Sequence, residues 1–102
     1  MTEIRKMPLR TRLIELKDSW AGWNFTARMN PPLRVFEDVT SGSLNKIIDS
    51  MSMVTLDWNF VDTEGAALPK PSHEVILEYV TSDLLTAMAN AWVDELANLP
   101  PV

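Results

Sequence analysis

Acidic and amide side chains gather in one short stretch, DWNFVDTEGAALPKP, which runs from residue 57 to residue 71. Such a density of oxygen ligands is typical of a calcium-binding loop, which needs oxygen at positions 1, 3 and 5 and Gly at position 6. Counted from Asp57, position 5 is Val61, and counted from Asp62, position 5 is Ala66. Because both registers fail, the sequence predicts neither a metal site nor a cofactor here.

His73 is the single histidine of the chain, and there is no cysteine. A zinc site built on a pair of histidines or on thiolates is therefore excluded. Ser72, His73 and Glu74 are adjacent in sequence, which does not give the converging geometry of a catalytic triad. Only three glycines are present, so no glycine-rich phosphate loop is available. We expect no enzyme and no catalytic residue, with Ser72 serving as a helix cap.

The acidic stretch is better explained as a turn. An Asp side chain such as that of Asp62 accepts hydrogen bonds from the backbone that follows it, and Gly65 supplies a positive φ. The prediction is an extended arm over Trp58–Val61, a tight turn at Asp62–Gly65 and a second arm over Ala66–Leu68. The two prolines of LPKPS then keep the chain extended. Residues 58–71 thus form a shaped connector.

The residues before this connector begin with a predicted β-hairpin. In WNFTARMN, apolar and polar residues alternate, which indicates a strand over Trp23–Met29 with one buried face. A second alternating run covers Arg10–Lys17, and the turn-forming residues DSWAG join the two. An isolated hairpin is marginally stable in water, so helices must cover its apolar face. Residues 1–8 show no period and are expected to be loose.

Helical periodicity follows the hairpin. We predict helices over about residues 31–39 and 43–57 before the connector, and two more between residues 72 and 99. Ser72 and either Thr81 or Ser82 are the expected caps of the last two helices. The fold class is therefore α+β: one domain over residues 1–102, in which a small N-terminal hairpin over 9–30 packs against about four helices. The apolar stripe of the second helix is made by Leu44, Ile47, Ile48, Met51 and Val54.

The charges of the chain are divided unevenly along its length. The net charge is −5, which argues against a nucleic-acid binder. Seven of the nine basic residues lie within residues 1–34, and eleven of the fourteen acidic residues lie within residues 35–102. This asymmetry either steers a partner or a second copy, or reflects two differently solvated faces. Short apolar runs, no leader-like start and no cysteine favour the reducing cytoplasm rather than a membrane or secretion.

Tryptophan and methionine are unusually abundant, with four and six residues respectively. Both residue types suit protein interfaces as well as cores. Trp20, in the hairpin turn, is the strongest interface candidate, whereas Trp23 and Trp92 lie on apolar faces that also suit a core. Met51 and Met53 cannot both point inward from one helix, so one of them is expected at the surface. The candidate protein-interface residues are Trp20, Trp23, Met53, Trp58 and Phe60.

Three segments in order, NPPLRVFEDVTSG, DWNFVDTEGAALPKPS and SDLLTAMANAW, carry a family resemblance. Together they resemble the tail assembly chaperones of long-tailed, siphovirus-type bacteriophages, particularly those that infect actinobacteria. The likeness covers about Trp20 to Ala97. Its core is the pattern W-N-x-x-D-x-x-G-x-x-L-P-x-P, here Trp58, Asn59, Asp62, Gly65, Leu68, Pro69 and Pro71.

The resemblance implies a function by binding. Such a chaperone coats the phage tape measure protein, keeps it soluble in the host bacterial cytoplasm and is absent from the mature virion. It also implies self-association, and a longer form of the same chain made by programmed frameshifting, of which this chain would be the short form. The alternative is a minor structural virion protein, such as a head–tail connector or a tail-completion component.

Overall fold

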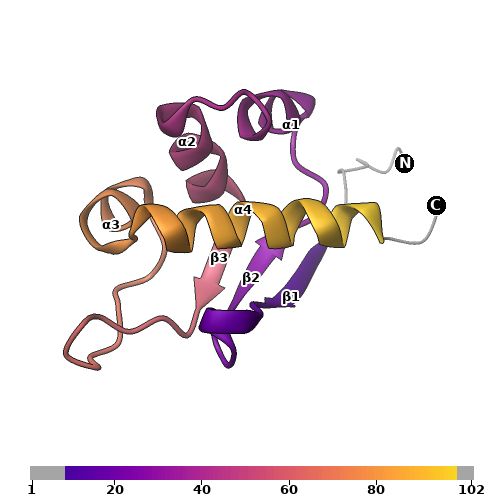
Figure 1. The fold of residues 1–102 in the computed structure, drawn as a ribbon. Helices are drawn as coiled ribbons and strands as arrows, with labels where there is room; N and C mark the ends of the chain where they lie inside the picture. Colours follow the sequence, from indigo (N-terminus) through magenta and orange to yellow (C-terminus); the bar gives the residue numbers. More distant parts are fainter. Residues whose placement is uncertain (1–8, 99–102) are drawn as a thin grey trace, which may run out of the picture.

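The structure is a computed structural model that describes residues 9–98. It contains a three-stranded antiparallel sheet near the N-terminus and four α-helices, which confirms the predicted α+β class (Figure 1). Residues 1–8, predicted to be loose, and residues 99–102 lie outside the described residues. The predicted hairpin and all four predicted helices are present.

The sheet is built from β1 (Thr11–Glu15), β2 (Asn24–Arg28) and β3 (Thr55–Trp58), in the order β1-β2-β3. Ile14 lies opposite Phe25, and both side chains are buried. Because strand residues alternate between faces, the neighbouring pair of Leu13 and Thr26 points to the other side. The alternation in the sequence therefore predicts both strands and the buried face of β2. A short 3₁₀ helix, Asp18–Trp20, forms part of the hairpin turn.

The third strand corrects one sequence prediction. The helix expected over residues 43–57 is α2 (Leu44–Val54), and the chain enters β3 directly at Thr55. The apolar stripe of α2 ends at Val54, and the backbone beyond it pairs with β2 instead, with Thr55 opposite Ala27. A register shift in this pairing leaves Leu56 and Asp57 both exposed. This long-range pairing has no local sequence signal, which is why it was missed.

The helices begin where the sequence places their caps. The Ser72 side chain accepts a hydrogen bond from the Val75 amide at the start of α3 (His73–Tyr79). The Thr81 side chain accepts one from the Leu84 amide at the start of α4 (Ser82–Ala97). Each bond satisfies an amide that has no partner within its helix. The first helix, α1, is shorter than predicted and covers Leu33–Val39.

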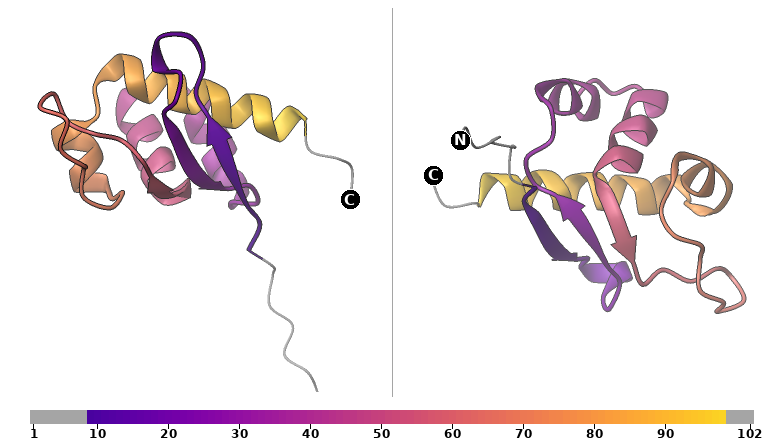
Figure 2. Two further views of the ribbon diagram at one scale, coloured as in Figure 1. Left: turned by 90° about the horizontal axis from the view of Figure 1, so that it is seen from below. Right: turned by 180° about the vertical axis from the view of Figure 1, so that it is seen from behind.

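Helix α4 lies across one face of the sheet, and α1 and α2 lie along one side of α4 (Figures 1 and 2). Trp92 of α4 is fully buried, and its indole Nε1 donates a 3.0 Å hydrogen bond to the Arg28 carbonyl of β2. Its ring stacks on Phe36 of α1 with centroids 5.6 Å apart. One side chain thus joins the helix, the sheet and α1, and the core interpretation of Trp92 is confirmed. Seen from behind, the strands lie in front of α4, with their other face uncovered (Figure 2).

Thr55 offers a test of the sheet's interior. Its side chain is 4% exposed, and its hydroxyl has no hydrogen-bond partner within residues 9–98. Burying an unpaired hydroxyl costs about 1–3 kcal/mol. We expect Thr55→Val to raise the free energy of unfolding by about 1 kcal/mol, because the substitution keeps the shape and removes that cost. Chemical denaturation measures the difference, with the half-buried Thr26→Val as control. A lower stability for Thr55→Val would contradict this description.

Candidate functional site

The connector between β3 and α3 closes on itself as a small hairpin. Val61 forms an isolated antiparallel bridge with Ala67, and the Leu68 amide donates a 3.0 Å hydrogen bond to the Phe60 carbonyl. These pairings confirm the predicted arms on either side of the turn. In Figure 1 the connector extends from the body of the molecule below α3.

The turn itself uses the acidic side chain that suggested a metal. The Asp62 carboxylate oxygen Oδ1 accepts hydrogen bonds from the amides of Glu64 (2.8 Å) and Ala66 (2.9 Å). Gly65 has a φ of +85°, a conformation that residues with a Cβ adopt only with strain. Asp62 therefore shapes the backbone. Residues 9–98 contain no group of three or more His, Cys, Asp or Glu side chains placed to hold a metal ion.

Asn59 fastens the connector to the β1–β2 turn. Its side-chain oxygen accepts a 2.8 Å hydrogen bond from the Asn24 amide, and its side-chain nitrogen donates a 3.0 Å bond to the Gly22 carbonyl. Its own amide donates to the Asn24 carbonyl at 3.2 Å. A side chain with both a donor and an acceptor is needed for this pair of contacts, which Asp cannot provide when ionised. Asn59 is thus a clamp between segments more than thirty residues apart in sequence.

Trp58 fixes the other end of the connector. Its indole Nε1 donates a 2.9 Å hydrogen bond to the Pro69 carbonyl, which holds the returning arm beside β3. Leu68, next to this proline, packs against the hydrophobic core. Trp58, Leu68 and Pro69 all belong to the sequence pattern that carries the family resemblance. The positions of that pattern therefore coincide with contacts that shape the connector.

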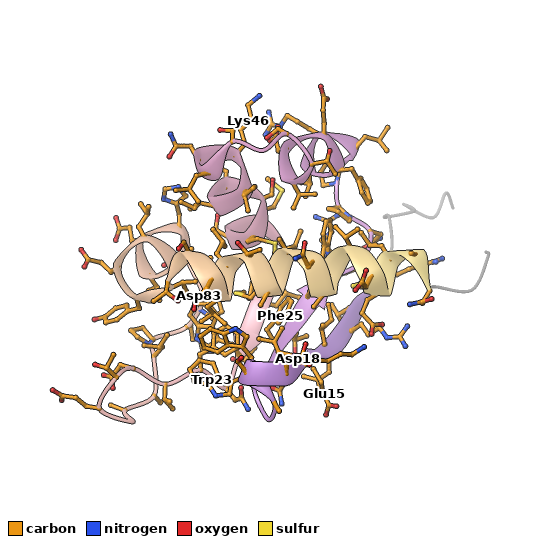
Figure 3. The ribbon with its side chains drawn as sticks, in the orientation of Figure 1. Glu15, Asp18, Trp23, Phe25, Lys46 and Asp83 are labelled. Atoms are coloured by element: carbon orange, nitrogen blue, oxygen red, sulfur yellow. The ribbon has the colours of Figure 1, made fainter. Side chains whose placement is uncertain are left out.

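Around this connector four aromatic rings meet, and we call Trp20, Trp23, Trp58 and Phe60 the aromatic cluster. The rings of Trp20 and Trp23 meet edge to face with centroids 5.2 Å apart. Phe60 lies 5.2 Å from Trp23 and 4.9 Å from Trp58, stacked on the latter. The three tryptophans are partly exposed, whereas Phe60 is 1% exposed. Figure 3 shows Trp23 beside the start of the connector, below α4.

The structure therefore divides the candidate interface residues. It brings Trp20, Trp23 and Trp58 together at the surface, a convergence that sequence spacing did not reveal. Phe60 lies beneath them, and its predicted role as a contact residue does not fit its burial. Met53 is 43% exposed on α2, outside the cluster, while Met51 is fully buried, as expected for this pair.

His73 makes a contact between two helices. Its Nε2 lies 2.8 Å from an Asp49 carboxylate oxygen on α2, and both side chains are largely exposed. The neighbouring Ser72 hydroxyl is used by the helix cap. The arrangement joins α3 to α2 and does not bring a nucleophile and a base together.

A second surface feature was not found from the sequence. A groove of about 450 Å³ runs between α4 and the end of the first hairpin strand, and we call it the acidic groove. Asp83 lies at one end, where a hydrogen bond from the Thr81 hydroxyl lowers the pKa of its carboxyl group. The charged residues of the lining are Glu15, Lys17, Asp18, Asp83, Asp94 and Glu95.

Comparison with protein-family models, curated proteins and solved structures finds no match to this chain. Within residues 9–98, no helix combines the length and the apolar character needed to cross a membrane.

The Asn59 clamp generates a direct prediction. We expect Asn59→Ala to lower the free energy of unfolding by about 1–2 kcal/mol, because two hydrogen bonds between distant segments are lost. Tryptophan fluorescence should change in the folded state, since Trp58 and Trp23 lie on either side of the clamp. Asp57→Asn is the matched control: it removes a charge from the same stretch and keeps an acceptor for the Trp58 amide. Equal stability of Asn59→Ala and the control would contradict the clamp.

Proposed function

We propose that this chain is a tail assembly chaperone of long-tailed bacteriophages that binds the tape measure protein and keeps it soluble while the tail tube assembles. The observation that carries the proposal is the construction of the connector. Asn59, Asp62 and Gly65, which belong to the resemblance pattern, each shape the backbone there. Because these residues determine the shape of the backbone and none of them is a catalytic group, the pattern supports a binding protein over an enzyme.

The aromatic cluster supports the same function through its chemistry. Trp20, Trp23 and Trp58 offer large apolar area that is only partly buried, on a base formed by Phe60. Aromatic residues held by packing lose little conformational entropy on binding and are common anchors in protein interfaces. An apolar helical tape measure would cover these rings. Because the area is small, each contact would be weak enough for the tube subunits to displace it.

Other exposed apolar side chains lie outside the cluster and extend the surface available to a long partner. Leu33 is 85% exposed on α1, and Met53 and Leu56 are each 43% exposed near the end of α2 and in β3. These side chains are not part of the hydrophobic core, because core side chains would be buried. They favour many loose contacts along one partner. The proposal includes the host cytoplasm as the site of action, self-association, and a frameshifted longer form as a further partner.

The first test is co-expression of this chain with the candidate tape measure protein. We expect the tape measure to become soluble and to co-purify with the chain. Trp20→Ala should reduce the affinity about tenfold, since it removes an exposed anchor, while it lowers the free energy of unfolding by about 1 kcal/mol or less. Leu77→Ala, which alters an exposed apolar residue of α3 outside both the cluster and this extended surface, is the control for binding. A larger loss of stability than of binding would make Trp20 a core residue.

Mass spectrometry of purified phage particles tests the alternative function. A chaperone acts before the tail is finished, so we expect no peptide of this chain in mature particles, although it should be present in lysates of infected cells. Major tail and capsid proteins from the same particles are the positive control. Recovery of this chain at a constant ratio to the tail proteins would instead establish a minor structural virion protein, such as a connector or tail-completion component.

A further inference from the structure

The outer edge of β1 is unpaired within residues 9–98, because β1 is an edge strand of the sheet. The Arg10 carbonyl accepts a hydrogen bond from the Met29 amide, and the Leu16 amide donates one to the Trp23 carbonyl, on either side of β2. Hydrogen bonding alternates along an antiparallel pair, so the backbone groups of Thr11, Leu13 and Glu15 point to the free edge. Such an edge is a template for one more strand.

The acidic groove lies beside the far end of this edge. One wall is formed by residues 14–20, and the other by the face of α4 that runs from Asp83 to Glu95. That face is about 18 Å long at 1.5 Å per helical residue, which matches about six residues of extended chain. Ala87 and Ala91 leave room along it, while Ile14 and Leu16, which are 1% and 5% exposed, form its floor as part of the core.

The charge of the groove is unbalanced. Arg12 pairs with Glu95 at 2.9 Å, but Glu15, Asp18, Asp83 and Asp94 have no cationic side chain within ion-pair distance among residues 9–98. Lys17 is the only basic residue of the lining. Figure 3 shows Glu15, Asp18 and Asp83 on the same side of the molecule, below and along α4. An occupant that carries positive charge would relieve this repulsion.

We propose that the acidic groove and the free edge of β1 receive residues 2–7 of a second copy of this chain, added as a fourth strand. This segment, TEIRKM, contains the adjacent cations Arg5 and Lys6 and the apolar residues Ile4 and Met7, and it lacks Gly and Pro. Its six residues match the length of the groove. The basic start of one copy and the acidic groove of the next are complementary in charge.

The register of pairing favours a second copy over the same chain. If residues 2–7 folded back through a two-residue turn at Pro8 and Leu9, Arg5 would lie opposite Arg12. A three-residue turn over residues 8–10 would place Lys6 there instead. Like charges directly opposite each other are destabilising, and both registers place the cations away from Asp18 and Asp83. A strand from another molecule has no such restriction.

The resulting contact is head to tail, because one copy supplies its N-terminal segment and the next supplies its groove. Repetition of such a contact builds a ring or an open helical array. Trp20 lines the groove and also belongs to the aromatic cluster, but Trp23 and Trp58 do not line the groove, so each copy retains those two rings for another partner. The inference concerns this chain alone and holds whether or not the tape measure is its partner.

The test is a charge swap in the full-length chain, measured by sedimentation velocity at low and high salt. The tail variant is R5E/K6E, and the groove variant is E15K/D94K. We expect each variant alone to self-associate about tenfold more weakly than the wild type at low salt, and an equimolar mixture of the two to recover association. Recovery in the mixture requires the segment of one molecule to enter the groove of another.

The matched control is E37K/E74K, which makes the same change in net charge on α1 and α3, away from the groove. We expect the control to associate at least as strongly as the wild type. All variants should keep the wild-type circular dichroism spectrum and melting temperature. Failure of the mixture to recover, or unchanged association after deletion of residues 1–8, would overturn the proposal. So would a groove variant that loses only tape measure binding, which would assign the groove to that partner.

Discussion

The Asn59 side chain is the contact on which the shape of this protein most depends. It accepts from the Asn24 amide and donates to the Gly22 carbonyl, so it joins the connector to the β1–β2 turn. The same residue continues the β3 pairing through its own amide. Because it follows Trp58 and precedes Phe60, this clamp also sets where both rings lie. The hydrogen bonds of Asn59 thereby determine where the aromatic cluster lies.

A second constraint fixes the opposite end of the sheet. Trp92 donates its indole proton to the Arg28 carbonyl and stacks on Phe36, so α4 cannot slide along the sheet without breaking a buried hydrogen bond. An unsatisfied buried indole N–H would cost free energy, which makes the position of α4 specific as well as favourable. The acidic groove follows from this placement, because α4 runs beside the end of β1 with Ala87 and Ala91 facing that side.

Much of this architecture is written in local sequence patterns. Alternation specified the hairpin and its buried face, and Ser72 and Thr81 marked two helix starts, because caps act over three residues. The turn of the connector was predictable because Asp62 and Gly65 act on neighbouring backbone. The third strand was not, since its pairing partner lies about thirty residues away and the apolar stripe of α2 leads directly into it. Local sequence patterns therefore predict the elements that local interactions determine.

The candidate surfaces were harder to predict for the same reason. Trp20, Trp23 and Trp58 were each plausible at an interface, but their convergence needs the clamp at Asn59, a contact between distant segments. The sequence does not predict the acidic groove, since its residues come from β1, the turn and α4.

The aromatic cluster and the acidic groove would attract a partner by different physical forces. The aromatic cluster offers apolar area, whose attraction changes little with salt, while the groove offers charge and free backbone groups, whose attraction falls as salt screens it. The proposed self-association and the proposed partner contact would therefore respond differently to salt. The two surfaces meet at Trp20, which lines the groove and also packs edge to face on Trp23, so a change at this ring would affect both.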